Sequence, residues 1–78
     1  MFKPNIRPTG HYEEFHCDVE WDLVIETLMC PTKSRPNRRR GDDRFTYIKR
    51  FRKFAIEVHV KKDEEGNIWV INAFKMWR

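Results

Sequence analysis

The chain has 78 residues, of which 40% are hydrophobic, 14% aromatic and 36% charged, with a formal net charge of +4 at pH 7. This length supplies one hydrophobic core and excludes a second domain, and the apolar content is too high for a disordered chain. No run approaches the ~18 apolar residues of a membrane span, and the N-terminus lacks the apolar core of a signal peptide. We therefore expect one cytoplasmic domain over residues 1–78, with 1–9 flexible and no membrane partner.

The first structural signal is helical. Trp21, Val24, Ile25 and Leu28 fall at positions i, i+3, i+4 and i+7, which is one apolar stripe of a helix. Pro31 ends this helix soon after residue 29, because proline cannot continue a helical hydrogen-bond pattern. A short helical turn over residues 11–16 is expected to precede it.

After Gly41 the apolar period changes from 3.6 to 2, which indicates strands. Residues 54–61 alternate between apolar and polar, and 63–67 form a turn in which Gly66 supplies a positive φ. A partner strand follows over 68–76, residues 44–49 form a strand before this hairpin, and 32–38 form an edge strand. The predicted fold is α+β, an N-terminal helix packed on a three- or four-stranded antiparallel β-meander.

The last strand is apolar at every second position on both faces. The pattern therefore leaves open whether Ile68, Val70 and Phe74, or instead Trp69, Ile71 and Ala73, face the core. Strict alternation predicts that Trp69 and Trp77 share a face. If exposed, that face is either a stacking platform or a dimer contact.

Charge is segregated along the chain. Residues 12–30 contain six acidic and no Lys or Arg residues, whereas 31–53 contain ten Lys or Arg and two acidic residues. Arginine pairs with phosphate oxygens, and interleaved aromatic residues can stack on unpaired bases, so we interpret this region as a binding surface for single-stranded RNA. The alternative is a charged strand edge that keeps the protein soluble, with the aromatic residues in the core. The candidate contacts are Lys33, Arg35, Arg38, Arg39, Arg40, Arg44, Tyr47 and Lys49.

Three side chains are the candidates for chemistry: His16, His59 and Asn72. Histidine transfers protons near neutral pH, and His59 lies two residues from Glu57 on the polar side of its strand, where a carboxylate can orient it. A solvent-facing strand histidine is the alternative, and His11 is a weaker candidate. Cys17 and Cys30 lack the spacing of a zinc site, so we expect structural thiols and neither a metal nor a cofactor.

The order of these elements, a histidine region and helix followed by a basic meander that ends in Ile71-Asn72-Ala73-Phe74, resembles the barnase/EndoU/colicin/RelE group of small ribonucleases over residues 10–78. The resemblance implies a toxin-like, metal-independent endoribonuclease. In it His16 would be the base and Arg44 and Lys49 the phosphate clamp. Asn72 would occupy the place where relatives often have Ser or Thr, a departure that leaves room for a domain that only binds.

Three functions follow from these features. The first is an RNA-directed domain with endoribonuclease activity. The second is a nucleic-acid-binding module without catalysis. In the third, the basic region docks an acidic protein partner such as an antitoxin, or the acidic helix of another copy in a homodimer.

Overall fold

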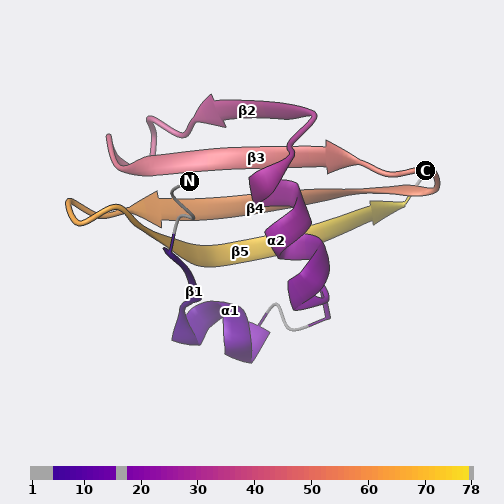
Figure 1. Ribbon diagram of the computed structural model, residues 1–78, viewed down its shortest axis with the longest axis horizontal. Helices are drawn as coiled ribbons and strands as arrows, with labels where there is room; N and C mark the ends of the chain where they lie inside the picture. Colours follow the sequence, from indigo (N-terminus) through magenta and orange to yellow (C-terminus); the bar gives the residue numbers. More distant parts are fainter. Residues whose placement is uncertain (1–4, 16–17, 78) are drawn as a thin grey trace.

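The computed structural model describes residues 5–15 and 18–77 of the chain. Within this part, two helices and five strands follow one another in the order shown in Figure 1. The elements are β1 (Asn5–Pro8), α1 (Gly10–Phe15), α2 (Trp21–Met29), β2 (Lys33–Pro36), β3 (Arg44–Arg50), β4 (Phe54–Lys62) and β5 (Asn67–Trp77). They form one α+β structure, as the sequence predicts.

The strands form a single mixed sheet in the order β1-β5-β4-β3-β2. Strands β2 to β5 are consecutive antiparallel neighbours, as the predicted meander requires, and β2 lies within the edge strand expected over 32–38. The predicted count of three or four strands is wrong for the described residues, because β1 adds a fifth strand to the sheet. The expectation of a flexible segment over 1–9 is wrong for residues 5–8, because β1 pairs in parallel with β5 from Asn5 to Pro8. A parallel pairing joins segments about sixty residues apart, so no local pattern of residues reveals it.

The helical predictions are confirmed. Helix α2 covers the predicted apolar stripe, and α1 accounts for the helical turn expected over 11–16 as far as Phe15. The segment before α1 is held to the sheet by Thr9, whose backbone N–H and side-chain hydroxyl both donate to the carbonyl of Val70, at 3.0 and 2.7 Å. The position of α1 beside β5 is therefore set by its entry from the β1 edge.

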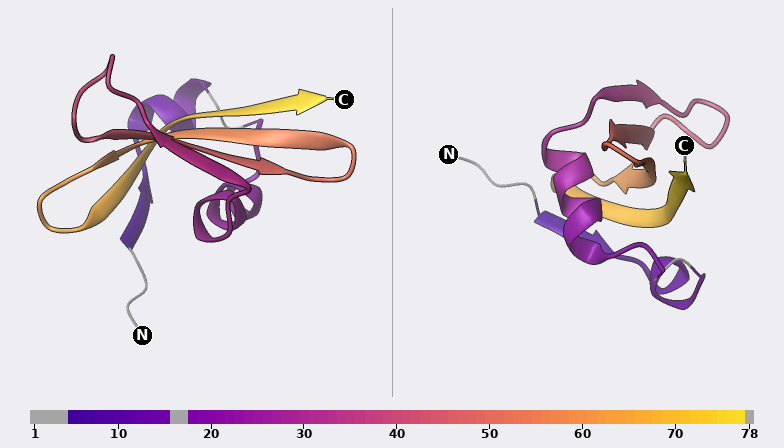
Figure 2. Two further views of the ribbon diagram at one scale, coloured as in Figure 1. Left: turned by 90° about the horizontal axis from the view of Figure 1, so that it is seen from above. Right: turned by 90° about the vertical axis from the view of Figure 1, so that its right-hand side faces the viewer.

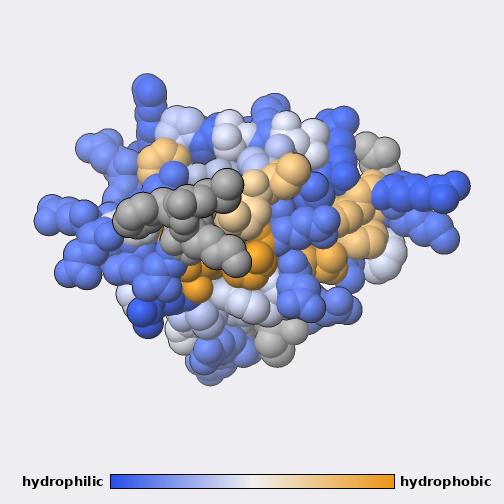
Figure 3. Space-filling view, viewed as in Figure 1, coloured by the Kyte–Doolittle hydropathy of each residue, from blue (hydrophilic) through white to orange (hydrophobic). Residues whose placement is uncertain are grey.

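The core lies between α2 and one face of the sheet, which α2 crosses in front of β3 to β5 in Figure 1. Val24 on the helix and Ile56 and Val58 on β4 are fully buried, in agreement with the apolar stripe of the helix and the alternation over 54–61. Thr27, not Ile25, is the second fully buried residue of α2, and its hydroxyl is satisfied by donating to the Leu23 carbonyl at 2.7 Å. On this side apolar residues gather in the middle of the surface and hydrophilic residues surround them (Figure 3).

A β-bulge in β5 decides which of its residues face the core. His59 of β4 is opposite Asn72, but the next residue, Val60, is opposite Val70, so Ile71 is an extra residue in β5. Val70 and Ala73 are both buried as a result. Neither alternating set expected from the sequence is correct, since the inward set is Ile68, Val70 and Ala73. The bulge also puts Trp69 and Trp77 on opposite faces, so the prediction that they share one is wrong.

Across the other face of the sheet, here called the open face, no helix of residues 5–15 and 18–77 is packed. Seen along the strands in the right panel of Figure 2, α2 lies on one side of the sheet, whereas α1 and the connection between β2 and β3 extend beyond its two edges toward the opposite side. The open face therefore lies between two rims, α1 at one edge of the sheet and residues 37–43 at the other. No helix in the described part of the chain is long and apolar enough to cross a membrane.

Candidate active site on the open face

A row of polar side chains crosses the middle of the open face. Arg35 of β2 is paired with Thr46 of β3, Thr46 with His59 of β4, and His59 with Asn72 of β5. Paired residues on neighbouring strands point to the same side of a sheet, so four residues that are far apart in the sequence become neighbours. His59 lies at the centre of this row.

His59 is held by contacts to both ring nitrogens. Its Nε2 lies 2.7 Å from Oε2 of Glu57, and its Nδ1 lies 3.3 Å from the amide nitrogen of Asn72. The Asn72 amide donates to Nδ1, so Nδ1 is the acceptor and Nε2 carries the hydrogen that is donated to Glu57. The side chains of His59 and Glu57 are 25% and 23% exposed. The pair is thus ordered by its surroundings and still reachable from solvent.

The edge of the Phe74 ring completes the surroundings of the imidazole. The two ring centroids are 5.5 Å apart, and the ring planes are inclined to each other by 68°. This contact and the two hydrogen bonds limit rotation of the imidazole, which presents Nδ1 on the side of Asn72. A carboxylate on one nitrogen and a weakly engaged second nitrogen is the arrangement in which histidine takes up and releases protons in hydrolytic enzymes.

Two cavities meet at His59, and both have arginine in their walls. The first, of about 310 Å³, includes His11, Arg40, Arg44, His59 and Asn72 among its lining residues. The second, of about 460 Å³, lies on the β2 side of the imidazole, and its lining includes Arg35, Arg38, Arg39, Thr46 and Glu57 as well as His59. An anion that enters from either side therefore meets guanidinium groups and the imidazole together.

The arginines of the rim are positioned by a tight turn between β2 and β3. The Arg40 N–H donates to the Asn37 carbonyl at 3.0 Å, and the Asn37 N–H donates to the Arg44 carbonyl at 2.8 Å. Gly41 follows with φ 141°, and a Cβ there would lie 2.9 Å from Oδ1 of Asp43. The turn places Arg38 and Arg39 at the second cavity and Arg40 at the first.

Arg44 contributes a cation that is only loosely paired. Its Nε is 3.8 Å from Oδ1 of Asp43, whose other oxygen is 3.8 Å from Nζ of Lys61. These distances are well beyond the ~2.7–2.9 Å of a charge-assisted hydrogen bond. The Arg44 side chain is 32% exposed. A phosphate in the first cavity can therefore bind this guanidinium without breaking a strong ion pair.

The structure brings together most, but not all, of the residues expected to bind RNA. Arg35, Arg38, Arg39, Arg40 and Arg44 line the two cavities with His59 and Asn72. Lys33 is exposed on the edge strand β2, outside both cavities. His16, the histidine favoured by the resemblance, lies outside the described residues, as does Cys17.

Tyr47 and Lys49 lie on the opposite side of the sheet from this site. They are paired with Val58 and Ile56, two buried residues of the core face. Lys49 donates to the Cys30 carbonyl at 3.0 Å, and Phe45 and Tyr47 pack against the core with Lys62 Nζ at 4.4 and 5.5 Å from their ring centroids. The run of basic and aromatic residues is therefore divided between two faces, because successive residues of a strand point in opposite directions.

The cavities also contain residues that the sequence prediction did not select, Thr46 and Asn37, and His11, which it ranked below the other histidines. The strand period carries the signal for Thr46, since Arg44 and Thr46 alternate onto the face of His59. Cys30, expected to be a structural thiol, is exposed at the end of α2. Among the described residues no group of His, Cys, Asp and Glu is arranged to hold a metal ion.

Comparison of the chain with protein-family models, curated proteins and solved structures gives no match. The assignment of a function therefore depends on the geometry of the open face.

Proposed function

We propose that the chain binds single-stranded RNA across the open face and cleaves it at a phosphodiester held beside His59. The observation that carries the proposal is the hydrogen-bonded His59–Glu57 pair, which lies where two arginine-lined cavities meet. The imidazole can transfer protons, and the guanidinium groups can bind and stabilise a phosphate whose charge increases in the transition state. The side chains of this face can therefore supply both proton transfer and stabilisation of the phosphate charge.

In the proposed reaction the RNA supplies its own nucleophile. Nδ1 of His59 accepts the proton of the ribose 2′-hydroxyl in place of the Asn72 amide, and the 2′-oxygen forms a bond to phosphorus. The bond between phosphorus and the 5′-oxygen breaks, and that oxygen takes up a proton. The products are a 2′,3′-cyclic phosphate and a 5′-hydroxyl, so no oxidant or second substrate is consumed.

Each neighbour of His59 has a part in this reaction. Glu57 accepts from Nε2 and stabilises the imidazolium that forms when Nδ1 is protonated. Arg40 and Arg44, in the wall of the first cavity, bind the phosphate oxygens. His11 lines the same cavity and supplies a second imidazole that can donate a proton to the leaving 5′-oxygen.

The test is cleavage of a labelled single-stranded RNA in EDTA. We expect His59→Ala to lower the rate by about 10²- to 10⁴-fold, the usual contribution of a positioned acid or base. Arg52→Ala, an exposed cation of the turn between β3 and β4, is the control and should retain the parent rate. His16→Ala, measured beside them, decides between His59 and the histidine favoured by the resemblance. Products with a 2′,3′-cyclic phosphate, and resistance of RNA with 2′-deoxyribose at the cut site, support the mechanism.

The same experiment separates the alternative functions. Intact RNA with a salt-sensitive mobility shift would contradict catalysis and indicate a binding module, which the Asn72 amide at Nδ1 also permits. Intact RNA without a shift would contradict both RNA functions and leave an acidic protein as the partner of the arginine-lined surface.

A further inference from the structure

A third cavity adjoins the proposed active site on the side of β1. It has a volume of about 440 Å³ and is lined by Thr9, His11, Arg44, Lys61, Asp63, Trp69 and Ile71. Three of these residues, His11, Arg44 and Ile71, also line the cavity that contains His59. The two spaces are therefore neighbours on one face, separated at the sheet by the bulge residue Ile71.

The indole of Trp69 is fixed in the wall of this cavity. Its Nε1–H donates to Oδ2 of Asp63 at 3.0 Å, and the Asn67 side-chain amide donates to the same oxygen at 2.9 Å. The other carboxylate oxygen accepts the backbone N–H groups of Glu65 and Asn67 at 3.0 and 2.8 Å. Asp63 therefore joins the indole to the turn between β4 and β5, and the ring is oriented before any ligand binds.

Cations flank this ring along a second row across the open face. Arg7 of β1 is paired with Trp69, Trp69 with Lys61, and Lys61 with Arg44. The Arg7 guanidinium lies 5.9 Å from the centroid of the ring, and Lys61 and Arg44 occupy the side of the cavity. On β3 and β4 this row lies two residues from the row of His59, which is about 6.6 Å at the usual rise of ~3.3 Å per residue. On β5 the offset is three residues, because of the bulge at Ile71.

We propose that this cavity is a nucleobase subsite, in which the base adjacent to the phosphate at His59 stacks on the indole of Trp69. This inference rests on the proposed function, since it places one nucleotide across two adjoining cavities. A flat aromatic base fits a fixed indole, and the attached phosphates meet Arg44 and Lys61. Stacking does not depend on the identity of the base, so the subsite accepts any of the four.

A fixed indole also raises affinity for a reason beyond contact area. A side chain that is already ordered loses little rotational freedom when the ligand binds, so more of the stacking energy contributes to affinity. The four hydrogen bonds that Asp63 accepts, two of them from the backbone, hold the half-buried carboxylate that orients this ring. It also separates Trp69 from Trp77, which is 71% exposed on the opposite face and for which the described residues provide no such anchor.

The test uses a ligand that cannot be cleaved. A fluorescent hexanucleotide with 2′-fluoro sugars lacks the nucleophilic hydroxyl, and six further versions each replace one base with an abasic sugar. Fluorescence anisotropy gives the Kd of each. For the parent protein we expect one abasic position to weaken binding by about 5- to 150-fold, the range found for a base stacked on an aromatic residue.

The variants show whether Trp69 is the group that binds the base. Trp69→Ala should weaken binding of the intact ligand by a similar factor and make the same abasic replacement nearly silent, because the two changes remove one contact. Trp69→Phe, which retains a ring, should recover most of the affinity, and Trp77→Ala should bind like the parent. Circular dichroism checks that each variant is folded.

The outcomes separate the subsite from catalysis. Equal effects of the abasic replacement in the parent and in Trp69→Ala would overturn the subsite even if RNA cleavage by His59 is observed. An abasic effect that is present in the parent and absent in Trp69→Ala would support the subsite even if the protein does not cleave RNA. Only the proposed cleavage would then be contradicted. If the parent protein binds none of the seven ligands, the subsite is overturned as well.

Discussion

At the scale of single residues, a side chain gains its role from the partners that hold it. Sequence proximity is sufficient for the pair of Glu57 and His59, which are two residues apart on one strand face. The third member, Asn72, reaches His59 only through strand pairing. The same holds for Trp69, since its indole is oriented by a carboxylate six residues away across a turn.

Asp63 predicts a pH dependence at this scale. Hydrogen bonds from Trp69 and Asn67 lower the pKa of its carboxyl from the ordinary 3.8 to about 2. Because the pKa is lower in the folded chain, the stability it contributes is complete above pH 3.8 and is lost as the pH falls through about 2. We expect the Nε1–H proton resonance of Trp69 to keep its neutral-pH shift to about pH 3 and to titrate near 2.

Two comparisons check this assignment. The indole resonance of Trp21, which has no contact with Asp63, is the internal reference, and Asp63→Asn should abolish the titration of Trp69. A midpoint near 3.8, or an unchanged titration in Asp63→Asn, would show that the carboxylate does not hold the indole.

At the scale of elements, irregular backbone positions shape the site. The bulge at Ile71 returns Ala73 to the core and leaves Asn72 beside His59. The turn after β2 brings the arginines of residues 38–40 to the rim of the open face. Gly41 supplies the positive φ of this turn. Both features lie at the rim of the cavities that meet at His59.

Gly41 can be tested directly. Gly41→Ala adds a Cβ at a positive φ and 2.9 Å from Asp43 Oδ1, so we expect a loss of about 1–3 kcal/mol in the free energy of unfolding. RNA affinity should fall as well, because the turn that carries the arginines must shift. Gly10→Ala is the matched control, since a Cβ at Gly10 has no atom within 4 Å. Urea denaturation measures both, and equal stability of the two variants would show that the turn is not strained.

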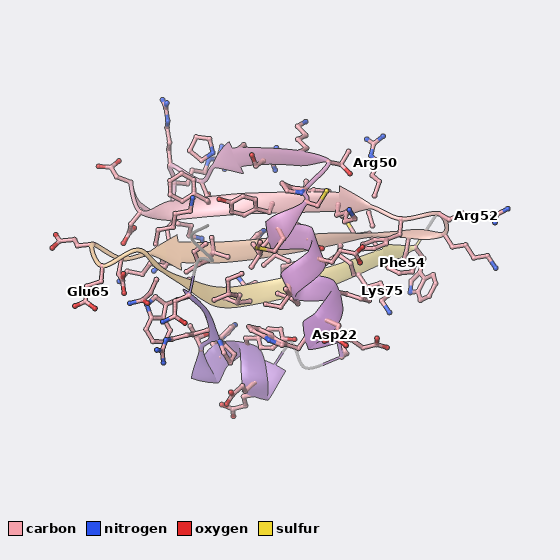
Figure 4. All side chains as sticks on the ribbon, viewed as in Figure 1. Asp22, Arg50, Arg52, Phe54, Glu65 and Lys75 are labelled. Carbon is pink, nitrogen blue, oxygen red and sulfur yellow. The ribbon has the colours of Figure 1, made fainter. Side chains whose placement is uncertain are left out.

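At the scale of the whole molecule, charge is distributed unevenly over the ends and faces of the sheet. Figure 4 shows Arg50 and Arg52 at one end of the sheet and Glu65 at the other. The arginines of residues 38–40 lie on the rim of the open face, whereas the acidic helix α2 covers the opposite face. We therefore expect a polyanion to approach the open face, where the arginines of residues 38–40 lie.

This arrangement predicts which cations bind phosphate. Arg38→Ala and Arg39→Ala should each lower the slope of log Kd against log salt by about 0.7 for a single-stranded RNA, since each removes one phosphate contact. Arg52→Ala, in the turn between β3 and β4, should leave the slope unchanged. Anisotropy titrations at several salt concentrations give these slopes. Equal reductions in all three variants would indicate binding to net charge rather than to the open face.

The sequence by itself determined the elements whose signals are local. The stripe of α2, the alternation of β4, the turn at Gly66 and the run of arginines each occupy a short stretch in which period or composition is unambiguous. The same alternation was sufficient to place His59 on a polar face with Glu57. These predictions required no knowledge of which strand pairs with which.

Only the tertiary structure decided the features that depend on pairing between distant segments. Strand β1 forms by pairing with β5, so its own residues do not predict it. The inward face of β5 cannot be predicted from its sequence, because both sides of the strand are apolar. One extra residue at Ile71 reverses the alternation, which moves Trp69 and Trp77 to opposite faces. The division of the basic run between two faces has a different, local cause, because neighbouring side chains of a strand point to opposite sides of the sheet.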